Sequence, residues 1–204
     1  LLCNNNNKIN DVNHLADTLD ELHCGYDSNG ICQKGISKLN KLRILSCHGN
    51  KKIHNVNHLA ETLEMLYCGY MNGINQEGIS RLKILTILDC YENENINSVN
   101  HLADTLDELH CGYESGIDQK GISELKVLRL LNCTGNKNIN SVNHLTNTLE
   151  GLFCDYNSGI DQNGISKLNK LKILDCTGNK NINSVNHLTN TLEELFCDYN
   201  SGIG

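Results

Sequence analysis

The sequence predicts an α/β solenoid, with a parallel β-sheet on one face and short helical segments on the other. The motif L-x-x-L-x-C-x-x-N, which runs from Leu42 to Asn50, recurs along the chain with its spacing kept. A sister motif, such as Leu63-x-x-Leu66-x-Cys68, alternates with it, and each unit takes about 21–23 residues. Self-similarity at this period is typical of solenoids, whose turns stack one on the next.

We call the units that end in a firm Asn type A and the sister units type B. The chain opens inside an A unit at residues 1–3, and the later units, B and A in turn, start at Leu19, Leu42, Leu63, Leu85, Leu106, Leu128, Leu149, Leu171 and Leu192. One extra residue falls in the first B unit, around Ser28-Asn29. No proline or linker interrupts the pattern, so we expect a single array over residues 1–204. Both ends fall inside a repeat, which favours a fragment of a longer solenoid.

Each unit begins with a short alternating stretch, for example Leu66-Tyr67-Cys68. Alternation with period two predicts a strand that turns its Leu and Cys to one face. The return to the next strand is short and leaves room for only one or two helical turns. Successive strands must therefore lie parallel, about 4.8 Å apart.

A polar cap residue and a short helical segment follow each strand. Cap side chains accept hydrogen bonds from the free N–H groups at the start of a helix. The candidates are Asn10, Asn97, Asn140 and Asn183 in A units and Asn75, Asp118 and Asp161 in B units. We expect the helical segments to turn Val56 and Leu59, or Ile79 and Leu82, back toward the strands.

Both unit types resemble leucine-rich repeats over essentially the whole chain. The B-unit tail from Gly73 to Leu82 is similar to the I-x-D-x-G-L-x-x-L tail of the cysteine-containing subfamily, which is common in F-box substrate receptors; Gln76 stands where that pattern has Asp. The Asn-rich alternation also resembles repeat proteins of amoeba-infecting giant viruses. The resemblance implies a curved horseshoe whose concave sheet binds other proteins.

The resemblance further implies an asparagine ladder at the strand ends, in which each amide bonds backbone groups of neighbouring turns. Such bonds matter because an unpaired buried backbone group costs free energy. The ladder residues are Asn6, Asn50, Asn93, Asn136 and Asn179. We expect a weaker ladder in the B units, because the equivalent residues there are Asp27, Met71, Glu114, Asn157 and Asn200.

Eleven cysteines are present, and all but Cys32 occupy one repeat position, two residues after a Leu. Free Cys behaves as a small buried hydrophobe, so we predict a reduced core ladder and a reducing, intracellular compartment. Metal binding by this ladder is disfavoured, because one thiol per turn falls short of the four ligands that Zn²⁺ takes. Cys32 occupies a helix-cap position instead. An exposed, reactive thiol is the alternative to a buried one there.

Two further rows recur along the chain. One row lies on the helical side and comprises His14, His58, His101, His144 and His187. Its members are two turns, about 10 Å, apart, whereas Zn–N bonds measure about 2 Å, so we predict structural or solvent-facing roles. A second row follows the B strands and comprises Tyr26, Tyr70, Tyr113, Tyr156 and Tyr199. These tyrosines either pack against their neighbours with the hydroxyl at the surface or bind a partner at the rim of the sheet.

Outward strand positions form two columns on the expected concave face. In one column the B units supply aromatic residues or His, and the A units supply small or acidic residues. Exposed apolar patches usually mark partner sites, and aromatic residues are typical of binding hot spots. The predicted binding residues are Ile44, Met65, Tyr67, Ile87, Asp89, Glu108, His110, Leu130, Asn132, Phe153, Ile173, Asp175 and Phe196. The alternative is that these side chains only support strand formation.

We therefore expect a non-enzymatic protein-interaction module without a cofactor. The net charge of −7 disfavours nucleic acid, and no apolar run approaches the roughly 20 residues that span a membrane. Neighbours such as His110 and Cys111 point to opposite faces of a strand, which excludes a catalytic pair. Two alternatives stay open: the substrate-recognition part of an F-box-type ubiquitin ligase receptor, although no F-box segment is present, and a structural solenoid that associates end to end through unpaired strand edges.

Overall fold

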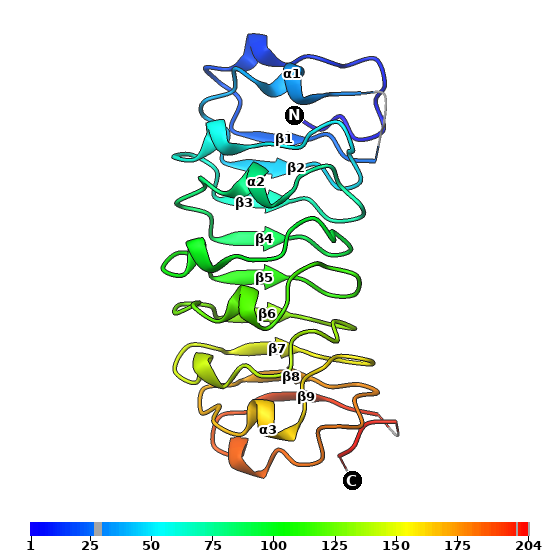
Figure 1. The fold of residues 1–204 in the computed structure, drawn as a ribbon, viewed down its shortest axis with the longest axis vertical. Coiled ribbons are helices and arrows are strands. Elements are labelled where there is room, and N and C mark those ends of the chain that lie inside the picture. Colours follow the sequence, from blue (N-terminus) through cyan, green and yellow to red (C-terminus); the bar gives the residue numbers. More distant parts are fainter. Residues whose placement is uncertain (27–29, 199, 204) are drawn as a thin grey trace.

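The computed structural model describes residues 1–26, 30–198 and 200–203, which form one solenoid with nine parallel strands in a single open sheet. The strands follow the order of the chain and each pairs with the next (Figure 1). They are β1 (Glu21–His23), β2 (Ile44–Ser46), β3 (Met65–Tyr67), β4 (Ile87–Asp89), β5 (Glu108–His110), β6 (Leu130–Asn132), β7 (Gly151–Phe153), β8 (Ile173–Asp175) and β9 (Glu194–Phe196). The first unit contributes only an isolated parallel bridge between Leu2 and His23.

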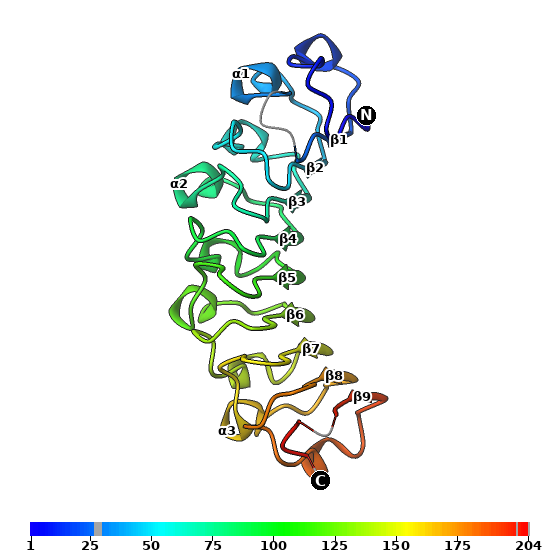
Figure 2. The same cartoon turned by 90° about the vertical axis from the view of Figure 1, so that its right-hand side faces the viewer.

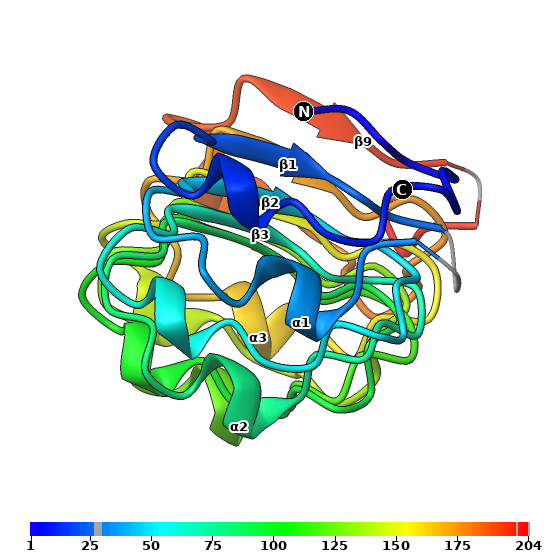
Figure 3. The same cartoon turned by 90° about the horizontal axis from the view of Figure 1, so that it is seen from above.

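Short helical segments line the other side of the solenoid. The A units carry 3-10 helices at Asn13–Leu15, Asn57–Leu59, Asn100–Leu102, Asn143–Leu145 and Asn186–Leu188. The B units carry α1 (Gln33–Ile36), α2 (Gln76–Ile79), the 3-10 helix Lys120–Ile122 and α3 (Gln162–Ile165). Figure 2 shows the sheet on the inner side of a gentle curve and the helices on the outer side, and Figure 3 shows the same two layers from above. The predicted α/β solenoid with a concave sheet is confirmed.

The core consists of the side chains that the repeat turns inward. Leu66 of strand β3, Cys68 directly after that strand, and Val56 and Ile79 from the helical side are completely buried. Burial of one such aliphatic side chain stabilises the fold by roughly 1.5–3 kcal/mol. The pairing register sets Leu66 beside Leu88 of the next strand, so every turn covers the core of the turn before it.

The helix caps follow the sequence prediction in B units and depart from it in A units. The side chain of Asn75 accepts a hydrogen bond from the Gly78 N–H at 2.9 Å, and Asp118 and Asp161 act in the same way. The predicted A-unit caps Asn10, Asn97, Asn140 and Asn183 are wrong, because each 3-10 helix starts three residues later, directly after a valine.

The asparagine ladder is present in the A units. Asn93 is fully buried; its Nδ2 donates to the carbonyls of Cys68 (2.9 Å) and Ile74 (3.1 Å), and its Oδ1 accepts from the Asn95 N–H (3.0 Å). The same three bonds hold Asn50, Asn136 and Asn179. Oδ1 of Asn6 accepts the N–H groups of Lys8 and Ile9 in its own loop.

The B units carry their own ladder, one residue later than predicted. Asn72, not Met71, is buried; its Nδ2 donates to the Cys47 carbonyl and its Oδ1 accepts from the Ile74 N–H. Tyr70 and Met71 before it both take left-handed backbone angles, with φ of 58° and 54°. The buried polar residue is the fourth after the Cys in this unit, whereas it is the third in A units.

In later B units a serine takes the place of this asparagine. Ser115 and Ser158 are buried, and the Oγ of each accepts from the N–H two residues on at 3.4 Å. The predicted positions Glu114 and Asn157 are exposed. The prediction for Asp27 and the extra residue at Ser28-Asn29 lie outside the described residues.

Gln76 ties its B unit to the following A unit, a role that the sequence did not indicate. Its Oε1 accepts from the N–H groups of Asn97 (3.0 Å) and Ser98 (2.9 Å), while its Nε2 donates to the Ser98 carbonyl (3.0 Å). Gln33 and Gln119 make the same three bonds. The repeat pattern that this chain resembles has Asp at this position. The longer Gln side chain reaches the backbone of the next unit and so bridges two turns.

The histidine row also ties turns together. Nε2 of His58 lies 3.0 Å from the Ile36 carbonyl at the end of α1, and His101, His144 and His187 make the equivalent contact one A/B pair further on. Burial of this ring edge lowers the pKa of His58, His101 and His144, partly offset by the bond to the carbonyl. These geometries give the row a structural role.

Candidate functional site

The strand register aligns the outward-facing residues in two straight columns. Tyr67 lies beside Asp89 and Asp89 beside His110, while Met65 lies beside Ile87. The first column is His23, Ser46, Tyr67, Asp89, His110, Asn132, Phe153, Asp175 and Phe196. The second is Glu21, Ile44, Met65, Ile87, Glu108, Leu130, Gly151, Ile173 and Glu194. All predicted binding residues lie in these columns, which together we call the concave strip.

Most side chains of the concave strip are half-buried by their neighbours in the columns. The first and last strands stand out, with Glu21 and Glu194 exposed and Phe196 48% exposed. The second column is aliphatic except at Glu108, at Gly151 and at its two ends.

The A-unit polar residues of the strip also serve the backbone. Oδ1 of Asp89 accepts from the Tyr91 N–H and Oδ1 of Asp175 from the Thr177 N–H, both at 3.0 Å, and Asn132 makes the same turn at 3.1 Å. Asx turns of this kind end a strand cleanly. One carboxylate oxygen of each aspartate thus has a structural task. The other oxygen, Oδ2, faces outward, and in Asp89 it lies 3.8 Å from Nε2 of His48.

Two histidines of the strip pair with glutamates on their own strands. Nε2 of His23 lies 2.6 Å from Oε1 of Glu21, and Nε2 of His110 lies 2.6 Å from Oε1 of Glu108. Residues two apart on a strand share a face, which permits both pairs. Burial and the carboxylates of Glu108, Asp89 and Glu21 raise the pKa of Tyr67, so this part of the strip is electronegative.

Ion pairs run along the edge of the sheet where the strands begin. A cation of each of three A units contacts an anion of a neighbouring B unit: Arg43 contacts Glu64 of the next unit (2.7 Å), and Arg129 and Lys172 contact Asp107 (2.6 Å) and Glu150 (2.8 Å) of the preceding unit. Exposed pairs contribute little stability, about 0–1 kcal/mol each. Their main effect is that positive and negative charges cancel along this edge.

An aromatic row follows the strands at their opposite ends. It consists of Tyr26, His48, Tyr70, Tyr91 and Tyr113, one ring per turn, and we call it the aromatic rim. Ring centroids of successive members lie 6.2, 5.3, 5.6 and 5.4 Å apart. The sequence pattern indicated the three B-unit tyrosines but missed His48 and Tyr91. Their shared position, directly after the A-unit Cys, was the available signal. Tyr199 of the predicted row lies outside the described residues.

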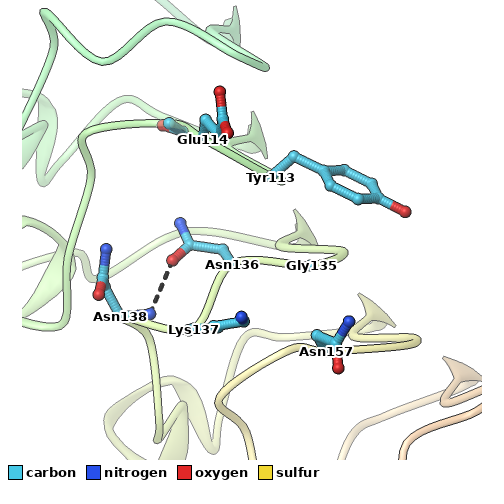
Figure 4. Close-up of a pocket in the computed structure, with 8 residues that line it drawn as sticks. Tyr113, Glu114, Gly135, Asn136, Lys137, Asn138 and Asn157 are labelled. Carbon is cyan, nitrogen blue, oxygen red and sulfur yellow. Dashed lines mark hydrogen bonds between the residues drawn. The ribbon is translucent and has the colours of Figure 1, made fainter.

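The rim continues into shallow hollows between successive loops. One of about 330 Å³ lies between Tyr113, Glu114, Lys137 and Asn157. Figure 4 shows these residues on three neighbouring loops, with the ring of Tyr113 projecting away from the chain and Asn136 bonded to the Asn138 N–H. The openings are wide, so they suit side chains of a larger partner better than an enclosed small molecule.

The cysteine ladder lies in the core as predicted. Burial raises the pKa of the Cys47, Cys90 and Cys133 thiols to about 12, so they stay protonated at neutral pH. In the part of the chain that the structure describes, no three His, Cys, Asp or Glu side chains are grouped to hold a metal ion. Cys32 is half-buried at the start of α1, with no cap bond from its side chain, and Cys197 in the last unit is exposed.

This arrangement predicts a selective thiol reaction. We expect 5,5′-dithiobis(2-nitrobenzoate) to modify Cys32 and Cys197 in the folded protein, and the other thiols only after unfolding. Thiolates are the reactive species, and burial suppresses their formation in the core. Absorbance at neutral pH, with and without denaturant, measures the two phases. Cys32→Ser should remove one equivalent from the fast phase, and a fast phase that titrates the ladder would contradict the buried placement.

His48 of the rim predicts a pH effect on stability. Its Nδ1 accepts the Gly69 N–H at 3.0 Å, which requires the neutral ring, and burial lowers its pKa below the ordinary 6.5 despite Asp89 at 3.8 Å. The unfolded chain therefore takes up the proton first as pH falls, and the stability due to His48 is lost below about pH 6.5. Urea unfolding at pH 7.5 and 5.0 should show wild type losing more stability than His48→Thr, the residue that later A units carry. Equal losses would refute this role.

Comparison with known proteins adds no family assignment. No protein-family model matches the chain. No curated protein matches it either. Among the residues that the structure describes, no helix has the length and apolar character needed to cross a membrane.

Proposed function

We propose that this chain is a leucine-rich repeat protein of the cysteine-containing type, and that it binds another protein on its concave sheet without catalysing a reaction. The repeated Leu and Cys spacing and the nine-strand solenoid support the first part. The Asn-rich alternation of units supports a relation to repeat proteins of amoeba-infecting giant viruses.

The observation that carries the binding proposal is the composition of the first column. Each B unit supplies an aromatic or imidazole ring, in the order His23, Tyr67, His110, Phe153 and Phe196, while the inward positions repeat without change. Core packing constrains only the inward residues. A row of rings beside half-buried Ile and Leu side chains fits the apolar, aromatic centre of a protein interface.

The polar groups of the strip indicate the complementary surface. The Oδ2 atoms of Asp89 and Asp175 lie among the apolar residues, that of Asp89 3.8 Å from Nε2 of His48. The Glu108 carboxylate, which contacts His110, adds to this negative charge. A partner with an apolar centre and Lys or Arg side chains around it would match this pattern. Charged groups at such a rim mainly set the rate and specificity of association.

The test is capture of a partner from host lysate by wild type and by the double variant Tyr67→Glu, Phe153→Glu. Both changes place a carboxylate in the centre of the strip, and we expect loss of at least ten-fold in captured partner. The charge-matched control is Ser80→Glu with Ser123→Glu, two exposed positions on the helical side. Circular dichroism checks folding. Equal capture by the folded strip variant would refute the proposal.

We further infer a reducing compartment for this protein. The core ladder consists of unpaired thiols, as in Cys68 and Cys90 of adjacent turns. Proteins of oxidising compartments rarely keep so many free cysteines. Cellular fractionation of the tagged protein tests the inference, and secretion with oxidised thiols would contradict it.

A further inference from the structure

The aromatic rim carries much of the exposed apolar surface of the described chain. Its members Tyr26, Tyr70 and Tyr113 are exposed, and so are Met71 and the next B-unit tyrosine, Tyr156. The other large exposed apolar side chains lie in the first or last turns, with Val127 as the exception. The concave strip is more covered, apart from Glu21, Glu194 and Phe196 in its end strands. Exposed apolar patches of this kind mark interaction sites.

The B-unit tyrosines occupy backbone positions that favour glycine. Tyr26, Tyr70, Tyr113 and Tyr156 have φ between 39° and 64°. Three A units meet the same requirement with glycine, at Gly49, Gly135 and Gly178, where φ is 67–69°, and the other two carry Asn5 and Glu92, with φ of 57° and 56°. A bulky residue in this region costs free energy, and such strain is found where a side chain has a task. The repetition of Tyr in B units therefore indicates that the ring itself is needed.

Carboxylates surround the middle of the rim. A hollow of about 270 Å³ beside it is lined by Glu92, Glu94 and Glu114, with Lys51 as the one cation among its lining residues. None of the three glutamates forms an ion pair within the described chain, unlike the charges at the opposite edge of the sheet. Burial, the neighbouring tyrosines and Glu92 raise the pKa of Tyr91 to about 12. The rings thus lie beside a group of carboxylates that have no ion-pair partner in the described chain.

We propose that the aromatic rim binds an extended, arginine-rich segment of a protein partner, with guanidinium groups on the faces of Tyr70, Tyr91 and Tyr113 and the glutamates of the adjacent hollow as counter-charges. A ring face attracts a cation, and a desolvated contact strengthens that attraction. Arginine also stacks on aromatic planes more readily than lysine. The acidic surroundings select against nucleic acid, and a neutral glycan would gain nothing from three unpaired carboxylates.

The probe is a fluorescein-labelled decapeptide of alternating Arg and Gly, measured by fluorescence anisotropy at physiological ionic strength. We expect saturable binding to wild type, and binding at least ten-fold weaker when citrulline replaces Arg. The test variant is Tyr70→Gly with Tyr113→Gly, which should lose at least ten-fold in affinity. Glycine suits the left-handed backbone of both positions, so folding is expected to survive, and circular dichroism verifies it.

Two controls separate ring contact from general attraction. Tyr156→Gly removes a tyrosine that lies between Thr134 and Thr177 instead of between rings, and it should bind the peptide as wild type does. Glu94→Gln with Glu114→Gln should weaken binding several-fold, whereas Glu77→Gln with Glu124→Gln, of equal charge on the helical side, should not. No binding to wild type, equal binding of the citrulline peptide, or undiminished binding by the folded glycine variant would overturn the proposal. The rim and the concave strip are tested by different residues, so either proposal can fail alone.

Discussion

Asn93→Ala is expected to lower the free energy of unfolding by about 3–5 kcal/mol, among the largest effects of any single change in this chain. The amide is fully buried and forms three bonds, two from Nδ2 to the Cys68 and Ile74 carbonyls and one from the Asn95 N–H to Oδ1. Alanine would leave all three backbone groups without a partner, and each such group costs about 1–3 kcal/mol. Guanidinium unfolding followed by far-UV circular dichroism measures the loss.

Asn6→Ala is the matched control for this prediction. Asn6 occupies the same repeat position, but it is only partly buried and donates to no preceding turn. We expect a loss of less than about 1 kcal/mol there. Hydrogen exchange should also show faster opening of the turn between Ile74 and Asn95 in Asn93→Ala. A loss at Asn93 no larger than at Asn6 would mean that the ladder does not hold the turns together.

Gly78→Ala is the second change with a large expected effect, a loss of about 2–4 kcal/mol. An added Cβ would lie 2.1 Å from the carbonyl oxygen of His54, a backbone atom that cannot move aside alone. The Gly78 carbonyl also accepts the Val56 N–H at 2.9 Å, so α2 must stay close to the preceding unit. Alanine therefore forces two turns apart and breaks this contact. Chemical unfolding of the purified variant measures the cost.

Gly151→Ala provides the comparison within the same chain. Its added Cβ would meet only side chains at ordinary contact distance, Leu130 at 3.5 Å and Phe153 at 3.9 Å, and Gly151 lies in strand β7. Alanine there should be neutral or stabilise by roughly 0.5–1 kcal/mol, because glycine is a poor strand residue. If Gly78→Ala were as mild as Gly151→Ala, the close approach of α2 to the preceding unit would be wrong.

The frame was predictable because one simple constraint sets it. Each Leu and Cys of a strand must face inward, so their spacing alone fixes the strand, the parallel register and the concave columns, as in Leu66 beside Leu88. The A-unit ladder followed from the resemblance for a related reason. Asn93 stands at a fixed distance after its Cys, and a buried strand end needs donors and acceptors.

The remainder depended on backbone angles and contacts between turns. Asn72 replaces Met71 in the B ladder because the B-unit turn buries the fourth residue after its Cys instead of the third, which residue types alone did not reveal. Asp89 belongs to the concave strip, but the bond from the Tyr91 N–H to its Oδ1 leaves less of it for a ligand than expected. His48 and Tyr91 join the aromatic rim only when successive turns are stacked. The location of the concave strip was therefore predictable from the sequence. Its binding specificity was not, because specificity depends on the partner.

Hydroxyl-radical footprinting of the captured complex tests most directly whether a partner covers the concave strip. Oxidation of side chains is read by mass spectrometry in free and bound protein. Binding on the strip predicts protection of Met65, Tyr67 and Phe153, while Tyr156, outside both proposed surfaces, keeps its rate. Unchanged oxidation of Met65, Tyr67 and Phe153 in a saturated complex would contradict the account.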